Sequence, residues 1–413
     1  MLEPAEALRI ILERCAPLPV ETCRTVDAMG RVLRHPIAST SALPPFDNSA
    51  MDGYALGGGA GILPAGSEWP VVGEQAAGDG VRDGARGAWE IMTGARVPDG
   101  LDRVIPVEQI ERLDSPARVR LLAEVAAGQN VRMAGSDVAA GDVVVAKDTV
   151  LGPQHLMLLA ALGVATVQTS VRPRVAAFCT GRELVDDPAA PLTPGLIRNS
   201  NGPFMAARIP RAGAELVHAE TVGDEVDAFV AAADRAREAG ARVLISTGAV
   251  SMGRYDFVPA ALERLGAEVL FHKVAIRPGK PLLFAQLPDG TLFFGLPGNP
   301  IAVAAGLRFF VEPALRAMLG LPRERTWRVP LAAAFAKKPR LHFYLKSRLA
   351  IDAQGQLAVT VLPGQESYRI RPLADANAWV TVPADAMELA AGTLVDVRGL
   401  GHLESPQWAW SEA

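Results

Sequence analysis

The sequence predicts a multidomain chain of the α/β plus β class, with a doubly wound α/β domain, an inserted small β-rich domain and a C-terminal β barrel. The chain has 413 residues, which is more than one ordinary domain of roughly 100–200 residues. Apolar residues make up 49% of the chain and charged residues 21%, a balance that favours packed cores over disorder. Between residues 172 and 321, apolar strands alternate with amphipathic helices, which is typical of a parallel sheet covered on both faces.

Changes in this rhythm give the domain boundaries. We assign residues 1–45 and 138–171 to a discontinuous mixed α/β linker domain, 46–137 to the inserted β-rich domain, 172–321 to the α/β domain and 322–413 to the C-terminal domain. The last of these has short strand patterns and no convincing helix, which predicts a small barrel or sandwich.

The elements follow from apolar periodicity and from Gly, Pro and Asp at the breaks. In the linker domain we expect helices at 4–15, 26–33 and 154–162 and a strand at 142–146. In the inserted domain we expect strands at 69–72, 89–92, 103–106 and 119–122. In the α/β domain we expect strands at 174–178, 214–217, 242–245 and 292–294, and helices at 203–212, 224–239, 259–265 and 301–319.

Composition also excludes several kinds of partner. The net charge is −4 and there is no Lys/Arg tract, so we expect no nucleic-acid partner. No apolar run reaches the roughly 20 residues that cross a bilayer, and the amphipathic run after Met1 predicts a helix rather than a signal peptide. The three cysteines form no CxxC pair and the six histidines no HExxH, so we expect a reducing, cytoplasmic location and no zinc site.

One loop of the inserted domain, Leu43–Ala55, has the composition of a binding loop. It places two carboxylates, an amide and a hydroxyl beside small residues that let the backbone approach a ligand. Phe46, Met51 and Tyr54 are its candidate apolar anchors. A tight turn capped by Asp and Asn is the alternative. Asp52 is the stronger site candidate, and Asp47 is better explained as a turn former.

Four more loops belong to the predicted α/β sheet, where ligands bind beyond the carboxyl ends of the strands. They are Phe178–Leu184, Ser246–Gly253, Ile276–Pro281 and Gly295–Pro300. The last leads into a helix at Ile301, whose first N–H groups would favour phosphate. Gly and Pro also end strands without any ligand, but four such loops at one edge favour an anion site. The chain has no GxxxxGK[ST] motif, so an ordinary ATPase is disfavoured.

Charged residues in and near these loops suggest how an anion is held. Lys280 is the candidate phosphate or oxyanion contact, with Arg277 close by. The carboxylates of Asp52, Asp137, Glu183 and Asp256 would repel an anion unless a divalent cation lay between them, and Mg²⁺ prefers carboxylate and phosphate oxygens. Helix capping is the alternative for Glu183 and Asp256. Cys179 and the histidines are better explained as structural.

Taken together, these motifs resemble those of a known family. Pro45–Ala55, Ile91–Ala95, Ser246–Gly253, Arg277–Pro281 and Gly295–Pro300 occur in the order seen in the MoeA family of molybdopterin molybdenumtransferases, which is related to the C-terminal part of gephyrin. The resemblance spans nearly the whole chain. It implies four domains in an elongated homodimer, with the site at the subunit interface.

The resemblance also implies a reaction, in which adenylylated molybdopterin and molybdate give molybdenum cofactor and AMP with the help of Mg²⁺. It places catalytic roles on Asp52, Thr93, Glu183, Asp256 and Lys280, and metal binding on Asp52, Asp137, Glu183 and Asp256. The implied substrate-binding residues are Thr180, Gly181, Ser246, Thr247, Gly248, Ser251, Arg277, Gly279, Pro297, Gly298, Asn299, Pro300 and Ser367. The last of these would face the cleft of the partner subunit.

The chain departs from the family pattern at four positions. Ala249 stands where a glycine is usual, Arg182 where Asp is frequent, Arg277 where some members have lysine, and Lys346 where arginine is common. Implied protein partners are a second copy of the chain, the protein that adenylylates molybdopterin and apo-molybdoenzymes. Two alternatives stay open: a non-catalytic molybdopterin-binding scaffold or paralogue, and a molybdopterin adenylyltransferase.

Overall fold

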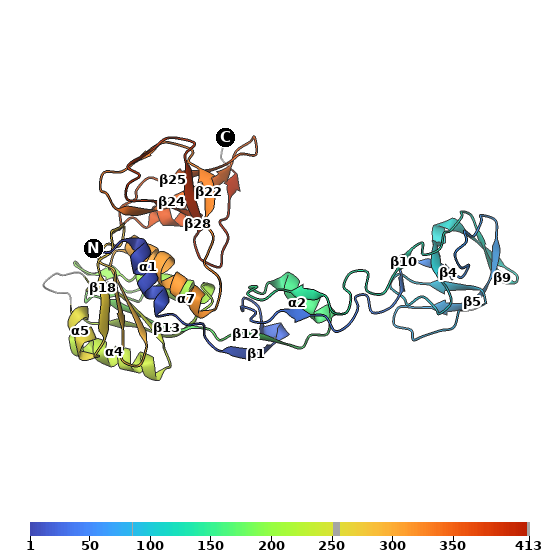
Figure 1. The fold of residues 1–413 in the computed structure, drawn as a ribbon, viewed down its shortest axis with the longest axis horizontal. Coiled ribbons are helices and arrows are strands. Elements are labelled where there is room, and N and C mark those ends of the chain that lie inside the picture. Colours follow the sequence, from blue (N-terminus) through green and yellow to red (C-terminus); the bar gives the residue numbers. More distant parts are fainter. Residues whose placement is uncertain (85, 251–256, 411–413) are drawn as a thin grey trace. The chain divides into compact units, whose positions relative to one another are not determined.

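The fold comes from a computed structural model that describes residues 1–84, 86–250 and 257–410 (Figure 1). The chain divides into two compact units. The first comprises Met1–Thr22, Gly30–Arg34 and Gln168–Ala413, and the second comprises Cys23–Met29 and His35–Val167. Across the described residues, no helix is both long enough and apolar enough to cross a membrane.

The first unit is built on a six-stranded sheet with the order β16-β13-β17-β21-β20-β18. Its strands are β13 (Arg174–Thr180), β16 (Glu215–Val222), β17 (Val243–Thr247), β18 (Glu268–His272), β20 (Leu283–Gln286) and β21 (Leu292–Leu296). The first four in this order pair in parallel, and β20 is antiparallel to both of its neighbours. We expected an all-parallel sheet, and this is wrong for β20. Neither β18 nor β20 was predicted from the sequence.

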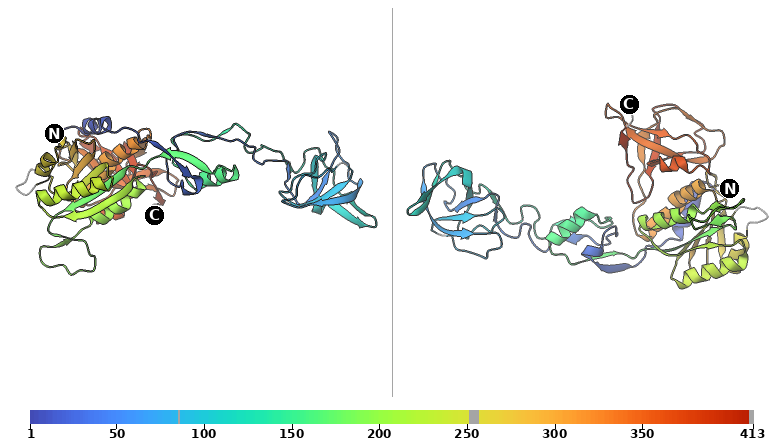
Figure 2. Two further views of the ribbon diagram at one scale, coloured as in Figure 1. Left: turned by 90° about the horizontal axis from the view of Figure 1, so that it is seen from below. Right: turned by 180° about the vertical axis from the view of Figure 1, so that it is seen from behind.

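Both faces of this sheet are covered, as the sequence predicts. Alternate residues of β13 enter two different cores, because successive side chains of a strand point to opposite faces. Val175 and Ala177 pack with α3, α6 and α7, whereas Ala176 and Phe178 pack with α4 and α5. Figures 1 and 2 show α4 and α5 together on one face. The helices are α3 (Asn201–Arg211), α4 (Val226–Glu238), α5 (Val258–Arg264), α6 (Pro300–Gly306) and α7 (Glu312–Met318).

The amino-terminal segment belongs to this core as well. Helix α1 (Pro4–Glu13) buries Ala7 and Ile11, one turn apart, in the same cluster as α7. Residues 1–22 therefore group with the α/β domain rather than with the predicted linker domain. The helix expected at 26–33 is also wrong: a 3₁₀ turn, Thr25–Asp27, is followed by Gly30 at φ 71°. That left-handed conformation ends any helical run.

The second unit contains a six-stranded sheet with the order β7-β4-β6-β5-β9-β8. Its strands are β4 (Gly53–Leu56), β5 (Glu68–Gln75), β6 (Ala88–Ile91), β7 (Arg103–Pro106), β8 (Ile110–Asp114) and β9 (Ala117–Leu121). The four strands expected in the inserted domain fall in β5, β6, β7 and β9. The remaining elements near this unit are β1 (Val20–Arg24), β2 (Ile37–Ala38), β3 (Asn48–Ser49), β10 (Val131–Arg132), β11 (Val143–Val145), α2 (Pro153–Ala161) and β12 (Thr166–Ser170).

The C-terminal part of the first unit forms a seven-stranded sheet around its own apolar core. Strands β19-β24-β26-β28-β22 follow one another, and β25 and β29 both pair with β24. Leu331, directly after β22, forms a bridge to Val359 of β25. The end of β22 therefore lies against β25, and the sheet curls back on itself. The elements are β19 (Ile276–Arg277), β22 (Trp327–Pro330), β23 (Phe335–Ala336), β24 (His342–Ile351), β25 (Leu357–Val361), α8 (Arg371–Ala374), β26 (Ala378–Val382), β27 (Glu388–Leu389), β28 (Leu394–Gly399) and β29 (Ala409–Trp410).

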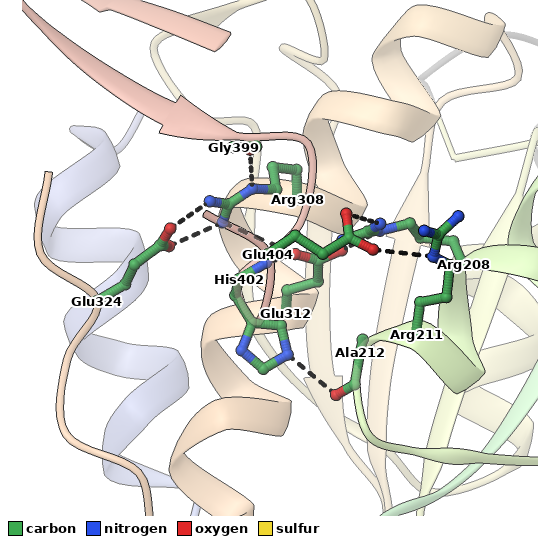
Figure 3. Close-up of polar contacts among 9 residues, drawn as sticks. All are labelled: Arg208, Arg211, Ala212, Arg308, Glu312, Glu324, Gly399, His402 and Glu404. Carbon is green, nitrogen blue, oxygen red and sulfur yellow. Dashed lines mark hydrogen bonds and ion pairs between the residues drawn. The ribbon is translucent and has the colours of Figure 1, made fainter. Parts of the chain in front are cut away.

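Buried charges join this C-terminal sheet to the α/β domain (Figure 3). The helix expected at 301–319 is interrupted by a π-helical turn, Leu307–Val311, which contains Arg308. The Arg308 Nε donates to the Gly399 carbonyl over 2.9 Å, and its Nη1 donates to Glu324 over 2.9 Å. Arg308 is 1% exposed. The π turn thus aims a guanidinium from the α/β domain at the C-terminal sheet.

Glu312, which is fully buried, is the centre of the same cluster. Its Oε1 accepts from Arg208 Nε over 2.7 Å, and its Oε2 accepts from the His402 backbone N–H over 2.9 Å. The second arm of Arg208 reaches Glu404 over 2.9 Å (Figure 3). A buried carboxylate is tolerated when its charge is paired and its oxygens are hydrogen-bonded. Both conditions hold for Glu312.

We predict that Glu312→Ala lowers the free energy of unfolding by about 3–5 kcal/mol, because it removes one partner of a buried ion pair and leaves Arg208 Nε and the His402 backbone N–H without their acceptor. Chemical denaturation followed by circular dichroism measures the change. Glu6→Ala is the matched control: Glu6 pairs with Arg9 on the surface at 2.6 Å, with both side chains about half exposed. Such a pair is worth about 0–1 kcal/mol. Equal losses in the two variants would contradict the prediction.

Candidate functional site

The main cleft of the first unit lies at the carboxyl edge of the α/β sheet and has a volume of about 720 Å³. The chain goes from β13 outward to β16, and then returns to β17 on the other side of β13. Strand order reverses at that point, which is where open α/β sheets bind ligands. The loops after β13, β17 and β21 all line the cleft. These three strand-end loops therefore meet at one edge of the sheet, as the sequence predicts.

Two Thr-Gly steps form the floor of the cleft. The Thr180 hydroxyl donates to the Thr247 carbonyl over 3.0 Å and joins the ends of β13 and β17. Gly248 has φ 92°, and a Cβ there would lie 2.7 Å from Thr180 Oγ1. No other residue fits this position without displacing backbone. A Cβ at Gly298 would lie 3.5 Å from the Gly248 Cα, so the loops after β17 and β21 meet at their glycines.

Of the predicted metal-binding carboxylates that the structure describes, Glu183 is the one that lines this cleft. Its side chain folds back over Gly181, where a Cβ would lie 2.6 Å from Glu183 Oε2. The carboxylate accepts no hydrogen bond from any residue that the structure describes. Asp224 also lines the cleft, and its Oδ2 accepts from the Arg182 backbone N–H over 3.2 Å.

This donor set suits one way of binding Mg²⁺. Over the described residues, no three His, Cys, Asp or Glu side chains form a ready metal cage. Mg²⁺ commonly takes one or two carboxylates and completes its octahedron with substrate phosphates and water. The uncommitted carboxylate of Glu183, beside backbone loops suited to phosphate, fits that mode and does not fit a zinc site.

The loop before α6 differs from its prediction in one respect. Pro297, Gly298, Asn299 and Pro300 line the cleft. The first N–H of α6, however, is not available to a phosphate: Pro300 has none, and the Ile301 N–H donates to the Ser367 carbonyl over 2.9 Å. The predicted anion contact at this helix N-terminus is therefore wrong. The loop backbone itself, not the helix, lines the site.

That bond also places the predicted site residue Ser367. The segment 364–369 of the C-terminal domain lies against the α/β domain of its own chain, and Tyr368 lines the same cleft. The resemblance places Ser367 at the partner's cleft; in this structure its backbone carbonyl contacts the α/β domain of its own chain. Lys346 supports the segment: its Nζ donates to the carbonyls of Gly364 over 2.7 Å and Arg369 over 3.0 Å. Burial lowers the pKa of Lys346.

Several predicted binding residues of the first unit do not line the cleft. Ser246 is fully buried within the sheet, and its hydroxyl finds no partner among the described residues. Gly279 and Lys280 lie in the loop between β18 and β20, of which only Pro281 lines the cleft. The Arg277 guanidinium lies 5.5 Å from the Phe343 ring centre, so its charge stacks on the C-terminal domain. Ser251 and Asp256 fall outside the described residues.

In the second unit, the structure brings Asp52 and Thr93 together, a contact that the sequence did not predict. Asp52 Oδ1 accepts from the Thr93 backbone N–H over 2.6 Å and from its hydroxyl over 2.8 Å. These bonds, the backbone one first, lower the pKa of Asp52 below 3.8. Asp137 is exposed, and its backbone N–H donates to the Leu43 carbonyl.

The rest of the Leu43–Ala55 loop behaves partly as expected. The sequence suggests a turn former at Asp47, but its Oδ1 accepts from the Ala134 backbone N–H over 2.7 Å, so this carboxylate ties the loop to a segment far along the chain. Tyr54 is a buried anchor, but Met51 is 41% exposed and anchors nothing. Asp52 follows Met51 directly and is exposed as well.

Sequence reasoning missed Asn199, Ser200, Asn201, Asp224 and Tyr368, all of which line the cleft. Asn201 Nδ2 donates to the Gly298 carbonyl over 2.9 Å and ties the start of α3 to the loop after β21. The run Asn199-Ser-Asn-Gly before a helix is a capping signal that could have found the first three. For Tyr368 no local signal exists, because only the tertiary fold brings it to the cleft.

Comparison with known proteins agrees with this geometry. Residues 2–163 match the MoeA N-terminal region (domain I and II), 176–317 a probable molybdopterin binding domain, and 328–400 the MoeA C-terminal region (domain IV). A molybdopterin molybdenumtransferase of Synechococcus elongatus is 37% identical, over 97% of this chain and 100% of that protein. The chain belongs to the MoeA family.

Further relatives agree with that membership. The molybdopterin molybdenumtransferase of Bacillus subtilis is 33% identical, over 97% of this chain and 98% of that protein. The crystal structure of a molybdopterin biosynthesis MoeA protein from Pyrococcus horikoshii OT3 superposes with a TM-score of 0.77 at 26% identity, covering 96% of this chain and 99% of that one. The mixed α/β and β architecture is thus the MoeA fold.

The family departure at Ala249 has a structural consequence. Ala249 lies in the cleft loop at φ 51°, in the left-handed region where a side chain is unfavourable. Arg182, in contrast, is exposed and contributes only its backbone N–H to Asp224. The MoeA-type glycine would relieve the strain at 249, whereas alanine restricts the loop.

We predict that Ala249→Gly raises the free energy of unfolding by about 0.5–1 kcal/mol, because relief of left-handed strain outweighs the extra unfolded-state entropy of glycine. Denaturant titration measures this change. Ala206→Gly on the exposed face of α3 is the control, and there glycine should cost about 1 kcal/mol. A comparable loss in both variants would refute the argument from strain.

We predict that Thr93→Val raises the pKa of Asp52 toward its ordinary 3.8, because one of two hydrogen bonds to the carboxylate is lost. The folded-state pKa is depressed, so these bonds stabilise the fold above about pH 4 and lose that effect as pH falls through the folded pKa. NMR titration of the Asp52 carboxyl carbon measures the shift. Thr166→Val in the same unit should leave it unchanged, and an unshifted Asp52 in Thr93→Val would contradict the assignment.

Proposed function

We propose that this protein transfers molybdenum from molybdate to adenylylated molybdopterin, forming molybdenum cofactor and releasing AMP. The observation that supports this most is the cleft at the β13/β17 switch point, where two Thr-Gly steps and a glycine-proline loop surround the uncommitted Glu183. Relatives that match the chain end to end are named molybdopterin molybdenumtransferases. In the reaction the oxygen of a water molecule replaces the phosphoanhydride link, so that AMP leaves and a phosphate stays on the pterin. The two dithiolene sulfurs displace two oxygens of molybdate, which take up protons and leave as water, with molybdenum unchanged in oxidation state.

The residues of the cleft have separate tasks in this proposal. The loop backbone at Gly181 and Thr247–Gly248 is proposed to let the phosphates approach closely, because glycine-rich turns favour an anion. The Thr180 hydroxyl and the Gly248 N–H donate to the Thr247 and Leu296 carbonyls and so shape this floor. The loop from Pro297 to Pro300 bounds the opposite wall. Lys280 does not itself line the cleft, but it directly precedes Pro281 of the cleft wall, is exposed and has no ion-pair partner among the described residues, so it is proposed as the oxyanion contact.

The carboxylates are proposed to hold Mg²⁺. Glu183 is the candidate in the cleft, with Asp52 and Asp137 from the second unit and Asp256 as further candidates. When bound, the ion would neutralise the phosphate charge and thereby favour cleavage of the phosphoanhydride. The lowered pKa of Asp52 favours the ionised carboxylate, which is the form that binds a cation.

We further propose a cytoplasmic homodimer in which each site combines residues of both copies, as the resemblance implies. The support from this chain is that the candidate carboxylates are divided between two separate compact units. If each site combines two subunits, a mixture of two inactive variants should regain part of the activity.

We predict that Glu183→Gln and Asp52→Asn each reduce molybdate-dependent AMP release from adenylylated molybdopterin by about 100-fold or more, because charge stabilisation of this kind is worth that much. Glu215→Gln, at the start of β16 and exposed, should retain activity. Chromatographic quantification of AMP measures the rate. Mixing the two inactive variants should restore part of the activity if subunits share a site.

Each other outcome favours a different function. Binding of the adenylylated pterin without AMP release in the wild type would support the scaffold or paralogue. Release of pyrophosphate from ATP in the presence of molybdopterin would support the adenylyltransferase. Normal activity of Glu183→Gln would count against the proposed site itself.

A further inference from the structure

Tyr368 has a largely exposed side chain on a firmly held backbone. The residue is 62% exposed and lines the cleft of the α/β domain. The sequence gives no role to Tyr368. A single exposed aromatic side chain is ordinary on a protein surface, but its place at the cleft makes this ring available to a ligand there.

The segment that presents Tyr368 is held from both sides. The Gln365 side chain accepts from the Lys346 backbone N–H over 3.0 Å and donates to the carbonyls of Lys346 over 2.8 Å and Leu362 over 2.7 Å. Two residues later, the Ser367 carbonyl accepts from Ile301 of the α/β domain. Together with the two bonds from Lys346 Nζ, these contacts fix Tyr368 at the cleft.

The chemistry of the cleft leaves one recognition task unfilled. Its floor consists of glycines, Thr180, Thr247 and a proline-rich loop, which suit phosphate groups. Tyr368 is the one aromatic side chain among the described residues that line it. The Arg369 guanidinium lies 5.8 Å from the centre of the Tyr368 ring, a cation–π contact that helps to hold the ring in place.

We infer that Tyr368 is a stacking platform for a planar heteroaromatic ring of the substrate. This inference rests on the proposed function, because the adenylylated pterin contains two such rings, the adenine and the pterin. Stacking of one base on an aromatic side chain changes binding constants by about 5- to 100-fold. Tyr368 is then a positioning residue, which orients the substrate while the glycine loops hold its phosphates.

Equilibrium binding to the full-length protein tests the inference, with three probes: AMP, a phosphate-free pterin and inorganic phosphate. Tyr368→Ala should weaken binding of AMP or of the pterin by about 5- to 100-fold and leave phosphate binding unchanged. Whichever of these two probes binds more weakly to Tyr368→Ala contains the stacked ring. Tyr368→Phe keeps the ring and should bind like the wild type. Ile370→Ala, which removes an exposed side chain two residues away, is the control.

Turnover supplies a second readout. Tyr368→Ala should raise KM for the adenylylated pterin with little change in kcat, since the lost contact is made equally in ground and transition states. Unchanged binding of both rings by Tyr368→Ala, or an equal loss in Tyr368→Phe, would overturn stacking while leaving the proposed function intact. If the wild type binds neither ring, both the inference and the proposed function fail.

Discussion

The arrangement of the first unit depends on a single buried cluster of charges around Glu312. Arg208 from α3, Arg308 from the π turn and the backbone of His402 all converge on or beside this carboxylate. Such clusters contribute little net stability, because desolvation offsets most of the attraction. They fix the orientation of the two parts instead, because a guanidinium donates its hydrogen bonds in only a few directions. The C-terminal sheet is thereby fixed against the α/β domain, and with it the segment that reaches the cleft.

The cleft itself is formed mainly by backbone. The loops after β17 and β21 meet at Gly248 and Gly298, and a Cβ at Gly248 would clash with Thr180 at the end of β13. A site of this kind binds a charged, flexible substrate through oriented N–H groups and hydroxyls, and needs few basic side chains. That is consistent with a chain whose net charge is −4 and with the stacking of Arg277 on Phe343 outside the cleft.

Much of this could be predicted from the sequence, because strands and strand-end loops have local signals. The Thr-Gly steps at 180–181 and 247–248 were predicted from residue type as strand-end loops, whereas the bonds between Asp52 and Thr93 were not predicted. The failures have physical causes. Strands β18 and β20 are short, and three successive residues of β20 are buried, so the direction of β20 leaves no local trace in the sequence. The capture of the Ile301 N–H by Ser367 and the arrival of Tyr368 at the cleft depend on partners about seventy residues apart in the chain.

Strand β19 shows how closely the two parts of the first unit depend on each other. Its two residues, Ile276 and Arg277, pair with β24 of the C-terminal sheet, while the same loop continues to Pro281 in the wall of the cleft. On the other side, Phe309 stacks on Tyr344 with ring centres 3.9 Å apart. Cutting the chain at the linker near Pro322 would therefore expose an open strand edge and an aromatic surface at once. The α/β domain is a module in its topology, but its surface is completed only by the residues that follow it.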